Sequence, residues 1–165
     1  AVLDFDRELN RLDFRSAHRA FVLLVHLAQI ARKSLIVQTH MPENYVVRAI
    51  QKWDFKYFYQ SELDVRKQVQ MPPYQNIVSV MMRGIKEEDV QQQMNNLYDQ
   101  LEKNSKNDII ISDPHPDMQP KLRDKYRYSV LLKGKSVENI LDLIHTELKQ
   151  LKKKRNLVTT VNVNP

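Results

Sequence analysis

The side chains best suited to bind a charged ligand lie in one short stretch, KLRDKYRYSVLLKGK at residues 121–135. Most of its odd positions are cationic, whereas its even positions are mainly apolar or aromatic. Successive side chains of a β-strand point to opposite faces, so this alternation predicts one strand with a buried face and a basic face. A row of cations suits the phosphates of a nucleic acid. The residues predicted to contact them are Lys121, Arg123, Lys125, Arg127, Lys133 and Lys135, with Tyr126 or Tyr128 packing beneath or stacking on bases.

Each cluster that could bind a partner also has a simpler interpretation. The basic stretch 121–135 could be a solvated outer face. LKKKRN at 151–156 is a second basic cluster, but cations at the C-terminal end of a helix also offset the helix dipole. WDFKYFY at 53–59 favours a packed core or a domain-docking seam over a platform for stacked bases.

Residue types that enzymes use are scarce. Cysteine is absent, which excludes disulfides, thiolate catalysis and cysteine zinc sites. With only Gly84 and Gly134, the chain can form neither a Walker A loop nor a dinucleotide-binding fingerprint. Among five histidines, His115, close to Asp117 in a proline-rich segment, is the one placed to approach a substrate. A stand-alone enzyme built on this pair is therefore the weakest hypothesis.

Composition points to a soluble protein with a polyanionic partner. The 165 residues are 42% hydrophobic and 28% charged, with a net charge of +6 and a pI near 9.5. No apolar run reaches the length of about 18 residues that a membrane span needs. The N-terminal residues lack the pattern of a secretory signal, so we expect a cytoplasmic protein and no membrane partner.

Apolar spacing divides the chain into two parts. In the first part, the expected elements are a strand within 1–10, helices at 13–33, 43–51 and 54–69, and a strand at 34–40. In the second part, they are strands at 77–84, 108–112, 126–134 and 157–165, helices at 86–104 and 136–155, and a loop at 113–120. The order β-α-β-β-α-β is the split-βαβ signature of a ferredoxin-like sandwich, which leaves one sheet face open.

Several motifs along the chain resemble the C-terminal end of a known family. They are DFRSAHRAFVLL (13–24), LIVQTHMPENY (35–45), ELDVRKQVQMPPY (62–74), KLRDKYRYSVLLKGK (121–135) and VNVNP (161–165). Their order and spacing resemble those of primosomal protein N′, the bacterial replication-restart DNA helicases called PriA. The resemblance implies an α+β chain: residues 1–51 would be the remnant of a RecA-like second helicase lobe, and 52–165 a DNA-binding C-terminal domain with two lead-in helices.

The resemblance also implies activity and partners. Family members are ATP-dependent 3′→5′ helicases that bind forked or single-stranded DNA, single-strand-binding protein and other primosome proteins. ATP, Mg and Zn are expected only in upstream parts of such a parent, so this chain is predicted to hold no cofactor and to be inactive alone. The main alternative is a protein-docking module for the helicase lobes or primosome partners. Half of a RecA-like sheet would expose an edge, which leaves a homodimer open.

Two segments differ from the family pattern. HLAQIARK at 26–33 stands where the family has QVAGRAGR, so the helicase motif is degenerate and no arginine-finger role is transferred to Arg32. Val137 and Leu141 stand where the family has a basic and an amide residue that contact the tail of single-strand-binding protein.

Overall fold

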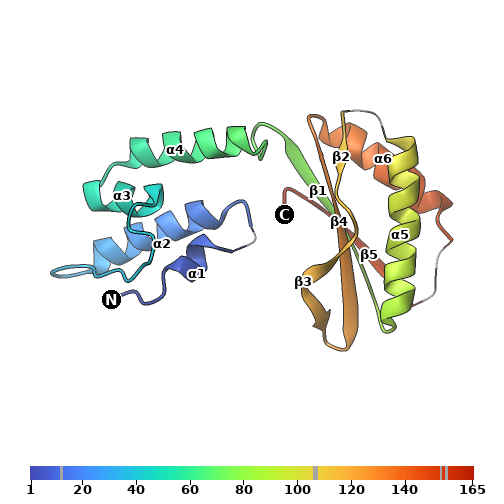
Figure 1. The fold of residues 1–165 in the computed structure, drawn as a ribbon, viewed down its shortest axis with the longest axis horizontal. Coiled ribbons are helices and arrows are strands. Elements are labelled where there is room, and N and C mark those ends of the chain that lie inside the picture. Colours follow the sequence, from blue (N-terminus) through green and yellow to red (C-terminus); the bar gives the residue numbers. More distant parts are fainter. Residues whose placement is uncertain (12, 106–107, 153, 155) are drawn as a thin grey trace. The chain divides into compact units, whose positions relative to one another are not determined.

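The computed structural model describes residues 1–11, 13–105, 108–152, 154 and 156–165. These residues form two units, 1–69 and 70–165, whose elements are labelled in Figure 1. The helix expected at 54–69 belongs to the first unit, whereas we had expected it to be a lead-in helix of the second domain. None of the described helices is long and apolar enough to cross a membrane.

The first unit consists of short helices. They are α1 (Asp6–Leu9), α2 (Ser16–Ile30), α3 (Tyr45–Lys52) and α4 (Phe55–Gln68). The strands expected within 1–10 and 34–40 are reduced to one parallel bridge between Val2 and Val37, because the described residues supply no further strand to pair with them. The sheet edge that suggested a homodimer is therefore not formed here. The assignment of residues 1–51 to a RecA-like lobe remains a prediction.

The first unit is held together by an aromatic core. The Phe21 and Phe58 rings stack with their centroids 3.8 Å apart, and Phe58 is fully buried. Asp54 begins α4 by accepting a hydrogen bond from the Tyr57 N–H at 2.9 Å. Part of the aromatic cluster at 53–59 thus packs in the core, while Trp53 and Tyr59 are half exposed.

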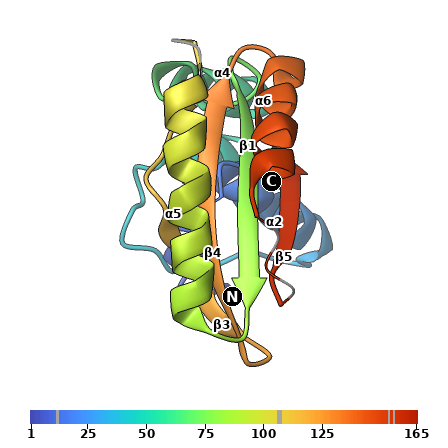
Figure 2. The ribbon, with the colours of Figure 1, turned by 90° about the vertical axis from the view of Figure 1, so that its right-hand side faces the viewer.

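The second unit is an α+β sandwich whose order of elements is the expected one with an additional strand, β3. Its elements are β1 (Asn76–Gly84), α5 (Glu87–Asn104), β2 (Ile110–Ile111), β3 (His115–Leu122), β4 (Lys125–Gly134), α6 (Val137–Gln150) and β5 (Val158–Val163). The antiparallel sheet has the order β2-β4-β1-β5, and β3 also pairs with β4. Helices α5 and α6 lie side by side against one face of this sheet (Figure 2).

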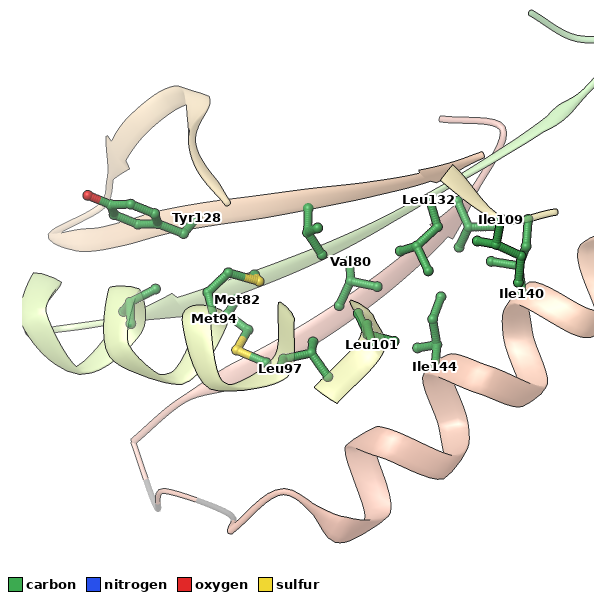
Figure 3. Packing of buried hydrophobic residues seen from close by; sticks show 13 residues of the cluster. Val80, Met82, Met94, Leu97, Leu101, Ile109, Tyr128, Leu132, Ile140 and Ile144 are labelled. Atoms are coloured by element: carbon green, nitrogen blue, oxygen red, sulfur yellow. The ribbon is translucent and has the colours of Figure 1, made fainter. Parts of the chain in front are cut away.

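The helices cover this face because both are amphipathic. Met94, Leu97 and Leu101 recur at helical spacing on α5, and Ile140 and Ile144 do so on α6. They pack against the alternate strand residues Val78, Val80, Met82, Tyr128, Val130 and Leu132 (Figure 3). The even positions of β4 therefore face the core, as the alternation in the sequence predicts.

Two expectations for the second unit were wrong. The segment 113–120 was expected to be a loop, but most of it belongs to β3. The prediction was wrong because Pro114, Pro116 and Pro120 are typical of a loop. An edge strand can accommodate proline because its outward N–H groups need no partner. The stretch 121–135 was expected to be one strand, but residues 121–122 end β3, and a turn at Arg123 and Asp124 leads into β4.

Candidate nucleic-acid interface

The side of the sheet opposite α5 and α6 carries a group of cations. Residues directly opposite each other in an antiparallel pair share a face, as do alternate residues of one strand. Arg83 on β1 stands opposite Arg127 on β4, and Lys125 lies two residues before Arg127. Since the neighbouring Tyr128 faces the helices, these three cations lie on the helix-free face. We call Arg83, Lys125 and Arg127 the basic end of this face.

The β3–β4 turn separates Lys121 from the basic end. Arg123 and Asp124 both have positive φ angles, 49° and 58°, as the two central residues of a type I′ hairpin turn do. Lys121 consequently stands opposite Tyr126, and its Nζ lies 4.9 Å from the centroid of that ring. Lys121 therefore shares the face of Tyr126, and the prediction that it shares a face with Lys125 was wrong.

The remaining predicted cations lie at two other places. Arg123 is exposed in the hairpin turn beside the basic end. Lys133, half buried, stands opposite Ile77, and the exposed Lys135 follows the end of β4. Lys133 lies six residue steps beyond Arg127 along β4, which is about 20 Å of strand. The described cations thus form two groups, with Ser129 and Leu131 between them, in place of the continuous basic face expected from sequence.

Neither tyrosine lies on the helix-free face. Tyr128 is 8% exposed, and its hydroxyl donates a hydrogen bond to Glu87 at 3.1 Å. Burial, reinforced by this carboxylate, raises the pKa of Tyr128 above its ordinary value. Tyr126 is half buried under Lys121. Both tyrosines pack against the core on the helix side of the sheet, and stacking of Tyr128 on a base is incompatible with its burial.

Arg127 is the most constrained cation of the basic end. Its Nη2 lies 3.2 Å from Asp117 Oδ2, and the two side chains are 21% and 23% exposed. Its Nε is buried and has no hydrogen-bond partner among the described residues. The carboxylate of Asp117 therefore occupies the Nη2 side of the guanidinium, and the Nε side is closed to solvent.

Sequence reasoning missed Arg83, because the strand containing it reads IVSVMMRG and has no basic pattern. Its place beside Arg127 follows from the register of β1 and β4. Within the second basic cluster, Lys154 donates to Asp89 at 2.8 Å, so it pairs with the acidic start of α5. Lys153 and Arg155 of that cluster lie outside the described residues.

The pair proposed for a stand-alone enzyme is not assembled. His115 Nδ1 contacts the carbonyl oxygen of Pro116 at 3.1 Å, and Asp117 binds Arg127. Across the described ranges of the chain, no group of three or more histidine, aspartate or glutamate side chains is arranged to hold a metal ion.

An α+β sandwich with one helix-free basic face thus occupies the second unit. The family model described as primosomal protein N C-terminal domain matches residues 67–165, and the chain belongs to this family.

Curated relatives match nearly the whole chain. Replication restart protein PriA of Borreliella burgdorferi is 25% identical over 98% of this chain, and that of Bacillus subtilis is 26% identical over 99%. PriA of Thermotoga maritima is 27% identical over 91%. The chain spans 25%, 21% and 20% of the length of these three relatives. Among solved structures, the de novo designed protein Foldit4 matches 54% of this chain and 94% of its own, with 19% identity and a TM-score of 0.44.

Proposed function

We propose that this chain is the C-terminal DNA-binding region of a replication-restart DNA helicase and holds branched or single-stranded DNA by its phosphates. The observation that carries the proposal is the basic end, where Arg83, Lys125 and Arg127 share the face of the sheet opposite α5 and α6. Guanidinium and ammonium groups bind phosphate without regard to base sequence, as a protein that recognises fork structure requires. Family membership supports the same role.

The chemistry of this face favours backbone contacts over base stacking. The two tyrosines of β4 face the helix side, so they offer no ring to bases on the opposite side. Thr160, which stands opposite Met81, adds a hydroxyl group to this face, whereas Ser129, on the other side of Met81, is buried at 5% exposure. We therefore infer affinity that depends strongly on salt and weakly on sequence. ATP hydrolysis, with its Mg, and the zinc sites would belong to other parts of the parent helicase.

Fluorescence anisotropy with labelled forked, duplex and single-stranded DNA tests the proposal. The variant Arg83→Gln/Lys125→Gln/Arg127→Gln is compared with Lys86→Gln/Lys103→Gln/Lys149→Gln, which removes the same charge from exposed positions on the helix side. The first variant is expected to flatten the dependence of log affinity on log salt by about 2.7, which is three contacts at 0.9 each. Equal slopes for the two variants would overturn the assignment of this face.

A docking function is the second candidate, because the first unit exposes aromatic side chains. Trp53 and Tyr59 are 49% and 50% exposed, and Phe55 packs edge-to-face against both Trp53 and Phe21. Such a surface suits another protein domain, including the helicase lobes of a parent or primosome partners such as single-strand-binding protein. If the isolated chain binds no DNA at low salt but binds these proteins, docking becomes the favoured function.

A further inference from the structure

One carboxylate lies within the basic end, and its position there is unusual for a strand residue. Asp117 belongs to β3, the edge strand, and pairs with Arg127 at 3.2 Å. Most acidic residues of the second unit belong instead to α5, α6 and their flanking segments. A negative charge beside a predicted phosphate contact calls for a physical explanation.

An irregularity in β3 places Asp117 against Arg127. Strand β3 pairs with β4 at Pro116 and Tyr128 and pairs again at Lys121 and Tyr126. The segment 117–120 therefore stands opposite Arg127 alone, which makes a large β-bulge. Bulges bend a strand and re-aim its side chains. Within this bulge, Asp117 Oδ1 accepts a hydrogen bond from the Met118 N–H at 2.6 Å, which fixes the carboxylate while Oδ2 contacts Arg127.

A carboxylate and a phosphate compete for the same donors of an arginine. Both offer oxygen pairs that match the planar guanidinium fork. The pair between Asp117 and Arg127 is partly exposed, so solvent screening keeps it weak enough to be displaced. Arg83, across the strand, would remain near an incoming phosphate and assist the exchange.

We propose that Asp117 is an internal competitor that occupies the phosphate position on Arg127 and so limits the affinity of the basic end for nucleic-acid phosphates. This inference rests on the proposed DNA-binding function. A phosphate binds Arg127 by displacing the Asp117 carboxylate, which then turns to solvent. Binding thereby stays reversible at moderate salt, although guanidinium groups line the face.

The test compares Asp117→Asn with Asp124→Asn in the full chain, using anisotropy with duplex DNA. Each variant removes one negative charge from the same hairpin. Asp124, however, is exposed in the turn, and its ion pair with Lys121 is a long one, at 4.0 Å. Asp117→Asn is expected to raise the affinity about three- to tenfold at about 50 mM salt, with the log–log salt slope unchanged because Arg127 contacts a phosphate in both proteins. Asp124→Asn is expected to raise the affinity by less than about twofold, with an unchanged slope.

The results of this test distinguish failure of the role of Asp117 from failure of the proposed DNA binding. If the wild-type chain binds no DNA, the proposed function fails. If it binds and the two variants behave alike, the function stands and the role of Asp117 is refuted. A double variant, Asp117→Asn/Arg127→Gln, should lose the gain. If Asp117→Asn lowers the midpoint of thermal unfolding, Asp117→Ser replaces it, and an unchanged affinity in a folded Asp117→Ser variant would equally refute the competitor.

Discussion

The substitution of Lys121 or of Lys125 by Gln should affect different properties of the chain, stability in the first case and DNA binding in the second. Lys125 lies on the helix-free face, whereas Lys121 lies on the other face above the Tyr126 ring. We expect Lys125→Gln to weaken DNA binding with little effect on folding. We expect Lys121→Gln to leave DNA binding nearly unchanged and to destabilise the hairpin.

The magnitudes follow from the structure. One phosphate contact contributes about 0.9 to the log–log salt slope, so between 50 and 200 mM salt the wild type should lose about 3.5-fold more affinity than Lys125→Gln. For Lys121→Gln, the lost cation–π contact is worth roughly 0.5–1 kcal/mol at a half-exposed site. Its 4.0 Å ion pair with the fully exposed Asp124 adds almost nothing.

Two assays on the same preparations check this prediction. Anisotropy with duplex DNA at several salt concentrations gives the slopes, and urea denaturation gives the free energies of unfolding. An equal loss of slope in both variants would refute the reasoning, because it would return Lys121 to the face of Lys125. A stability loss confined to Lys125→Gln would contradict it as well.

Three further predictions concern stability. Gly84→Ala would place a Cβ 2.3 Å from Leu157 Cδ2, so urea denaturation should show a loss of about 1–2 kcal/mol. Tyr128→Phe should make the loss of stability at high pH shallower. Because the pKa of Tyr128 is raised in the folded state, the contribution of this tyrosine to stability is complete below about pH 10 and disappears as the pH rises through the folded-state pKa. Circular dichroism between about pH 9 and 12 would follow this loss. Phe58→Ala should lower the free energy of unfolding by about 3–5 kcal/mol, because Phe58 is fully buried against Phe21, whereas Lys56→Ala, an exposed change on the same helix, should have little effect on thermal denaturation.

Local patterns in the sequence predicted the second unit well where one face of an element is buried. The spacing of Val90, Met94 and Leu97 predicted α5, and the alternation of Tyr128, Val130 and Leu132 predicted the buried face of β4. Burial imposes a period of 3.6 residues on a helix and of two on a strand, and both periods can be read without knowing the partners. The first unit was predicted less well, since a strand such as the one expected at 34–40 requires neighbours to pair with.

The candidate interface was only partly predictable. Lys125 and Arg127 were identified from the pattern, but Arg83 was not, and Lys121 was placed on the wrong face. The turn at Arg123 and Asp124 was missed because it contains no glycine or asparagine, the usual residues at positive φ. Leu122 and Lys125, which flank this two-residue turn, stand opposite each other and share a face, so the odd–even alternation reverses across the turn and Lys121 was misplaced.

The sequence by itself therefore determined the elements of the second unit other than β3 and the β3–β4 turn, its basic character and its family. Only the tertiary structure decided which cations share a face and that Asp117 lies among them. The physical reason is that periodicity reports the side chain's direction within one element. The pairing of Arg83 with Arg127, and the bulge that brings Asp117 to Arg127, depend on the register between strands that are distant in the chain.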